Sequence, residues 1–221
     1  MRVIYRFGKQ GRLRFVSHLD LQRYMQRTLN RTGLPVAYSL GFNPHPVMSF
    51  ASALAMGWES EYEVFDVKLA HIVPVEEAIE RMRASLPEEM PIYEARIVED
   101  NHPAMMALVK MAEYRITPSE HLEELKNGAR EFLFSDSVMA IRKTKSGERE
   151  VDIRPLCVKL TSEGDALVAR TMLTEVDTLK PDLLMSKLSE MAGIEVPRLR
   201  IERKLLLGSK KDGKLKPLME L

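Results

Sequence analysis

The first hundred residues alternate between two periods of apolar side chains. Strands are predicted where apolar residues cluster or alternate, at residues 3–7, 36–38, 62–69 and 92–98. A helical period covers residues 17–32, where Ser17 can cap the helix with Asp20 three positions later, and a second helix is predicted to begin at Pro74. The order strand, helix, strand, strand, helix, strand is that of a ferredoxin-like domain.

A similar order recurs after residue 113. Strands are predicted at residues 114–116, 138–142, 151–160, 165–173 and 199–207, with a turn at residues 145–148. One helix is predicted from a capping sequence at residues 117–120 through Phe134, and another from Pro181. The pattern therefore predicts an α+β protein of tandem ferredoxin-like (βαββαβ) domains with antiparallel sheets.

The predicted domain boundaries follow from these two repeats. They are residues 1–102 for the first domain, 103–112 for a Met-rich connector, 113–207 for the second domain and 208–221 for a mobile, lysine-rich tail. No apolar run approaches the length of about 18 residues that a membrane-spanning helix needs. The first residues lack a secretory signal, so we expect a cytoplasmic protein.

Charge is distributed unevenly, although the net charge is only +1. Up to residue 57 the single acidic residue is Asp20, and the basic side chains that we select as candidate RNA- or phosphate-binding residues are Arg12, Arg14, Arg23, Arg27 and Arg31. A block of arginines with few acids is typical of a protein that binds a polyanion. The last three arginines lie at i, i+4 and i+8 of the predicted helix, which is equally the pattern of an ordinary solvated face.

The segment 38–46 is the second candidate site. Its prolines on either side of His45 exclude a central strand and predict a rigid, exposed turn. Aromatic, amide and imidazole groups on such a loop suit base stacking, proton transfer or contact with a partner. The candidate residues of this loop and of the adjacent helix start are Ser17, His18, Asp20, Tyr38, Phe42, Asn43 and His45.

Catalysis by this chain has weak support. His18 and His45 are the histidine pair that we consider as general base and acid, and His18, Asp20 and His45 lack the spacing of a helical metal site. The single cysteine, Cys157, cannot hold an iron–sulfur cluster. In the second half, Arg149, Asp152 and Arg154 form a further polar cluster, or an ion-paired strand.

Four motifs together resemble one bacterial family. They are residues 11–21 with Arg23, residues 32–46 with the sequence Gly-Phe-Asn-Pro-His-Pro, residues 49–54 and residues 151–155. They are similar to the radical-SAM-linked protein family of unknown function, in its stand-alone accessory form. The resemblance implies a radical SAM protein as partner, with the iron–sulfur cluster and SAM held by that partner and no cofactor in this chain. Leu40 stands where the family pattern has a polar residue.

These observations favour a non-catalytic accessory protein that presents RNA or a ribonucleoprotein to a radical SAM enzyme. One alternative is a metal-independent RNA-processing endonuclease that resembles the tandem ferredoxin-like CRISPR RNA endonucleases and uses His18 and His45. Another is an adaptor that binds only protein. The sequence alone leaves all three open.

Overall fold

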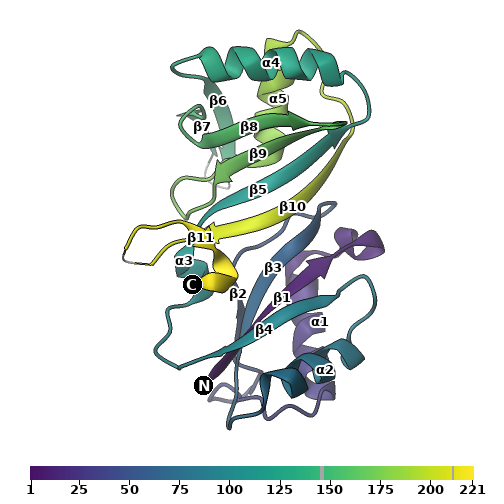
Figure 1. The fold of residues 1–221 in the computed structure, drawn as a ribbon, viewed down its shortest axis with the longest axis vertical. Coiled ribbons are helices and arrows are strands. Elements are labelled where there is room, and N and C mark those ends of the chain that lie inside the picture. Colours follow the sequence, from purple (N-terminus) through teal and green to yellow (C-terminus); the bar gives the residue numbers. More distant parts are fainter. Residues whose placement is uncertain (145–146, 211) are drawn as a thin grey trace. The chain divides into compact units, whose positions relative to one another are not determined.

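The computed structural model describes residues 1–144, 147–210 and 212–221, and the chain divides into two compact units (Figure 1). Unit 1 comprises Met1–Val109 and Leu206–Leu221, and unit 2 comprises Lys110–Leu205. The described residues form five α-helices and mostly antiparallel strands. The predicted α+β class is therefore confirmed.

Unit 1 is built on an antiparallel sheet in the order β4-β1-β3-β2. Its strands are β1 (Arg2–Lys9), β2 (Met48–Phe50), β3 (Glu59–Lys68) and β4 (Ile92–Val98). The 3₁₀ turn η1 (Gly11–Phe15) and helix α1 (His18–Arg31) follow β1, and α2 (Val75–Ser85) follows β3. The short helix α3 (Met105–Leu108), strand β11 (Lys216–Pro217) and turn η2 (Leu218–Glu220) complete the unit.

Helices α1 and α2 pack on one face of this sheet (Figure 1). The inward positions of α1, which recur every three or four residues, are Leu21, Met25 and Leu29, and all three are buried. They contact the sheet residues that form the unit's core, where Tyr5 stacks on Phe65 with ring centroids 5.0 Å apart. This packing fixes which face of α1 remains exposed.

The end of the chain contacts the opposite face of the sheet. Leu218 and Leu221 are buried, and the Met219 amide donates to the Tyr62 hydroxyl at 3.2 Å. Strand β11 also pairs with the end of β10 (Leu199–Gly208). Within the predicted tail 208–221, these residues therefore pack on unit 1, where burial of the two leucines removes their apolar surface from water.

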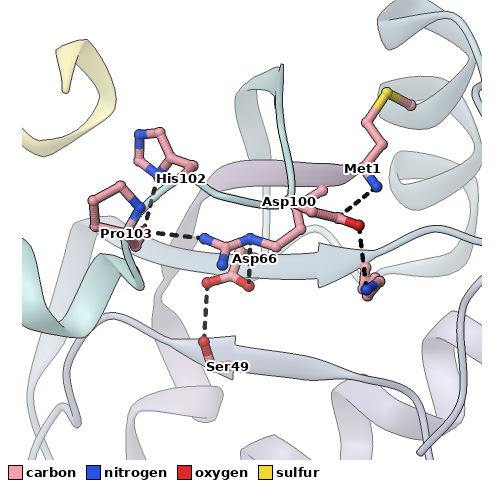
Figure 2. A network of polar contacts seen from close by, with 8 residues as sticks. Met1, Ser49, Asp66, Asp100, His102 and Pro103 are labelled. Atoms are coloured by element: carbon pink, nitrogen blue, oxygen red, sulfur yellow. Dashed lines mark hydrogen bonds and ion pairs between the residues drawn. The ribbon is translucent and has the colours of Figure 1, made fainter.

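A polar network beside this face ties the ends of unit 1 together (Figure 2). The Met1 amine and the Lys68 ammonium contact Asp100 at 2.5 and 3.2 Å. His102 Nε2 lies 3.1 Å from the Leu221 carbonyl oxygen. The buried Asp66 carboxylate accepts a hydrogen bond from Ser49 at 2.9 Å, and burial raises the pKa of Asp66 above its usual range.

Unit 2 contains a sheet in the order β10-β5-β9-β8 and a separate two-stranded hairpin. The sheet strands besides β10 are β5 (Val109–Pro118), β8 (Cys157–Glu163) and β9 (Ala166–Met172), and the hairpin consists of β6 (Met139–Thr144) and β7 (Gly147–Asp152). Helices α4 (Leu122–Phe134) and α5 (Pro181–Met191) cross at Gly128, where a Cβ atom would meet the Leu188 carbonyl oxygen. Only glycine allows that approach.

Most predicted elements of unit 1 are confirmed, but the predicted strand 36–38 is wrong, because Val36 and Tyr38 form only isolated bridges and the second strand is β2. Unit 2 shows two larger errors. The predicted helix start at residues 117–120 is wrong, because β5 continues to Pro118 and α4 begins after His121, whose φ is +61°. The single predicted strand 151–160 is broken in two, because the Asp152 carboxylate accepts from the Arg154 amide at 3.0 Å and stabilises a turn. Residues 145 and 146 of the predicted turn lie outside the described residues.

The burial of Leu218 leads to a stability prediction. We expect Leu218→Ala to lower the free energy of unfolding by about 2–5 kcal/mol, because it deletes a fully buried side chain. Urea unfolding followed by circular dichroism measures the change. The matched control Leu215→Ala removes a side chain that is 45% exposed and should change stability by less than about 0.5 kcal/mol. Equal, small effects of both changes would show that the end of the chain does not stabilise unit 1.

Candidate functional site

The outer face of α1 presents the three arginines of the predicted stripe. Arg23, Arg27 and Arg31 are all exposed, because the core side chains of the helix occupy the opposite face. Arg23 forms an ion pair with Asp20 at 3.4 Å, and Arg31 donates to the Thr28 hydroxyl at 2.9 Å. Within the described residues, Arg27 has neither a hydrogen bond nor an ion pair. Its guanidinium is the one of the three that no neighbour engages.

The two arginines of η1 have different surroundings. Arg14 contacts the buried Glu59 carboxylate at 3.3 Å and lies 4.7 Å from the centre of the Phe15 ring. The same carboxylate accepts from the Gly11 amide, so Arg14 is part of the local structure. Arg12 is exposed, with no ion pair among the described residues. Of the two, Arg12 is therefore the better placed to contact a phosphate.

A buried lysine, which the sequence did not single out, supports η1 from below. The Lys9 side chain is 1% exposed, and its ammonium donates to the carbonyl oxygens of Val16 at 2.9 Å and Arg14 at 3.3 Å. These bonds hold the chain between β1 and α1, since an ammonium away from water requires acceptors. From its sequence position, Lys9 would be expected in solvent, because a lysine at the end of a strand is normally solvated. The neighbouring glycine indicates only a turn.

The beginning of α1 is capped as predicted. The Asp20 amide donates to the Ser17 hydroxyl oxygen at 3.2 Å, and that hydroxyl donates to the Asp20 carboxylate at 2.7 Å. His18 packs edge-on against Phe50, with ring centroids 5.3 Å apart. Burial, with a smaller contribution from the Lys9 charge, lowers the pKa of His18 below its ordinary 6.5. Burial therefore favours the neutral form of His18.

The candidate loop 38–46 is closed by hydrogen bonds across its base. The Ser39 amide donates to the His45 carbonyl oxygen at 2.9 Å, and the Ser39 hydroxyl accepts from the His45 amide at 3.1 Å. The same hydroxyl lies 2.9 Å from His45 Nδ1. Gly41 has φ of +120°, which only glycine adopts without strain. The loop is thus a preorganised turn rather than a loose segment.

Two fully exposed apolar side chains lie at the tip of this loop. Phe42 and Leu40 have no buried surface, and Asn43 beside them is also exposed. The Tyr38 hydroxyl donates to the Asn30 side chain at 2.7 Å, so the base of the loop is attached to the last turns of α1. Asn30 lies beside Arg31 in the sequence and one helical turn after Arg27. The loop and the arginine stripe therefore belong to one connected surface of unit 1.

His18 and His45 are not joined by any contact among the described residues. The ring of His18 lies on Phe50, and that of His45 faces Ser39 and the Asn43 carbonyl oxygen. Among the residues that the structure describes, no three His, Cys, Asp or Glu side chains converge in a way that could hold a metal ion. The described helices also include none that is long and apolar enough to span a bilayer.

The second-half cluster supports the hairpin of unit 2. The Asp152 carboxylate accepts from the Val138 amide at 2.9 Å, and this backbone bond is the main cause that lowers the pKa of Asp152. The Arg154 guanidinium donates to the Leu133 and Cys157 carbonyl oxygens. Arg149 is exposed on β7. Asp152 and Arg154 thus have structural contacts that connect the hairpin with the end of α4.

The fold and this surface define an α+β protein of two units with a basic helix and an exposed aromatic loop. The family model described as an uncharacterized protein conserved in bacteria (DUF2344) matches residues 2–181. The chain belongs to this family. A search of curated proteins finds no match.

The lowered pKa of His18 predicts how stability depends on pH. Between the folded pKa and the ordinary value of 6.5, the unfolded chain binds a proton that the folded protein does not. The free energy of unfolding should therefore fall as the pH decreases below 6.5, as measured by urea unfolding at pH 7.5, 6.5 and 5.5. His18→Gln should reduce this decrease and the control His45→Gln, at an exposed ring, should not. An identical pH profile for all three proteins would contradict the assignment.

Proposed function

We propose that this protein is a non-catalytic accessory subunit that binds RNA or a ribonucleoprotein and presents it to a radical SAM enzyme in the cytoplasm. We further infer that both units are ferredoxin-like domains. The strand orders β4-β1-β3-β2 and β10-β5-β9-β8, each with two helices between strands, support that inference. The hairpin β6–β7 is then an insertion between the first helix and the second strand of the second domain.

The Tyr38–Asn30 hydrogen bond is the observation that carries the RNA proposal. It attaches the exposed aromatic loop to the helix that presents Arg27 and Arg31. Arginines neutralise phosphates, and an exposed aromatic ring stacks on an unpaired base. Both features therefore occur on one surface, at the end of α1. The open sheet face that RNA-recognition modules use is contacted in unit 1 by the end of the chain, where the Met219 amide donates to the Tyr62 hydroxyl.

The roles within the surface follow from the contacts. Arg27 and Arg12 would bind phosphates most strongly, because neither has an ion pair among the described residues. Arg23 would contribute less, because Asp20 already neutralises part of its charge. Phe42, Asn43 and His45 would contact a base or the partner enzyme. The iron–sulfur cluster and SAM would be bound by that partner.

Single-stranded RNA binding tests the first part of the proposal. Arg27→Ala should weaken binding of a fluorescent 20-nucleotide RNA and lower the log–log salt slope by about 0.7 for the lost phosphate contact. Arg23→Ala should have a smaller effect, and Arg130→Ala, an exposed arginine on α4, should have none. Fluorescence anisotropy at several salt concentrations measures both quantities.

The same samples distinguish the alternatives. Unchanged affinity and slope in the Arg12, Arg27 double alanine variant would remove the phosphate-binding role and leave the adaptor that binds only protein. RNA cleavage on a denaturing gel in the presence of a chelator, lost in His45→Ala, would instead support the endonuclease. We expect RNA of unchanged length.

Association with the radical SAM protein from the same genome tests the second part. Phe42→Ala with His45→Ala should reduce co-purification by about tenfold or more, because exposed aromatic anchors dominate binding energies. Phe134→Ala is the matched control, since Phe134 is an exposed phenylalanine in unit 2. The melting temperature of each variant should stay near that of the wild type. Absence of association at micromolar concentrations, with and without RNA, would refute the accessory role.

A further inference from the structure

Unit 2 contains a groove between its hairpin and helix α5 that none of the preceding roles uses. It consists of two adjoining hollows of about 550 and 380 Å³. Ile141, Leu183 and Ser186 line both hollows, so the two hollows lie next to each other and together are called the groove. Volumes of this size are typical of sites that bind small molecules or peptide segments.

One wall of the groove is the hairpin, where residues 139–142 of β6 and Glu150 of β7 line the two hollows. Ile141 and Glu150 are cross-strand partners, so part of this wall is a face of the hairpin. Because successive side chains of a strand point to opposite faces, the consecutive residues 139–142 also place the free edge of β6 along the groove. On its other edge β6 pairs with β7, and the described residues include no further strand of this sheet.

The opposite wall is one face of α5. Leu183, Ser186, Lys187 and Glu190 recur at i, i+3, i+4 and i+7, which is the spacing of a single helical stripe. Lys187 and Glu190 form an ion pair at 2.7 Å, so they neutralise one another. A groove between an unpaired strand edge and a helix fits an extended chain, which forms backbone hydrogen bonds to the strand and places alternate side chains against the helix.

The polar groups differ at the two ends of the groove. Near the beginning of α5 the larger hollow is lined by Arg142, Lys180 and Asp182. The Arg142 guanidinium donates to the Thr178 carbonyl oxygen, which holds it at this end. Two cations and one carboxylate leave an excess of positive charge. An incoming segment with a carboxylate at this end, and apolar side chains toward Ile141 and Leu183, therefore complements the groove.

We propose that this groove binds an extended peptide segment of a partner protein as a third strand on β6. The segment carries apolar residues at alternate positions and an acidic side chain or a C-terminal carboxylate near Arg142 and Lys180. A two-stranded hairpin outside the main sheet gains backbone hydrogen bonds from such an addition. The proposal concerns unit 2 alone and does not depend on RNA binding by unit 1.

Selection of peptides by the full chain tests this proposal. Random decapeptides with free C-termini are displayed on phage, and enriched sequences are synthesised and titrated by fluorescence anisotropy. We expect alternating apolar residues with a terminal carboxylate, and at least tenfold weaker binding when alternate backbone nitrogens in one register are methylated. Methylation in the other register should have little effect, because only one edge of the peptide faces β6.

Variants locate the bound peptide. Leu183→Lys should weaken peptide binding at least tenfold. The control Val196→Lys, at an exposed apolar position outside the groove, should leave the affinity unchanged. If Leu183→Lys unfolds the protein, Ser186→Arg serves instead. Ser186 is exposed, so an arginine there obstructs the groove with little effect on folding. No enrichment, or binding that both groove variants retain, would overturn the proposal. Concentration-dependent dimerisation that Ser186→Arg abolishes would also overturn it and identify a second copy as occupant.

Discussion

The packing of α1 on the aromatic core of unit 1 is the constraint on which the candidate surface depends. Leu21, Met25 and Leu29 fix the rotation of the helix, because turning it would expose these residues to water at a cost of about 1.5–3 kcal/mol each. That rotation leaves the three arginines outward. It also places Asn30 where it holds Tyr38 and, through Tyr38, the aromatic loop. The arrangement of the candidate surface is therefore a consequence of the core.

The beginning of α1 has a second fixed point, in the buried Lys9. Its ammonium satisfies the carbonyl oxygens of Arg14 and Val16, while Glu59 holds the Gly11 amide and the Arg14 guanidinium. These charges serve the turn between β1 and α1 and are correspondingly less available to a ligand. An arginine count along the sequence thus overestimates the basic surface, whereas the contacts separate Arg14 from Arg12 and Arg27.

Local signals explain which elements could be predicted from the sequence. The capping residues Ser17 and Asp20 act within one helical turn, so the beginning of α1 was predicted correctly, and the exposed turn before His45 was indicated by its prolines. The errors involve features beyond one helical turn. The start of α4 is displaced because β5 continues to Pro118, and the burial of Leu218 and Leu221 in unit 1 depends on residues far away in the sequence. The buried environment of Lys9 likewise has no local signature.

The two proposed surfaces rely on different forces, and this difference bears on how they could serve one accessory protein. The RNA binding proposed at Arg27 would be driven largely by release of counterions from RNA and would weaken steeply with salt. Pairing along β6 uses neutral backbone groups and apolar contacts, which salt affects little. A peptide contact in unit 2 could therefore persist while RNA dissociates from unit 1. Such a division would let a partner complex exchange one RNA for the next, because the salt-sensitive contact is confined to the substrate.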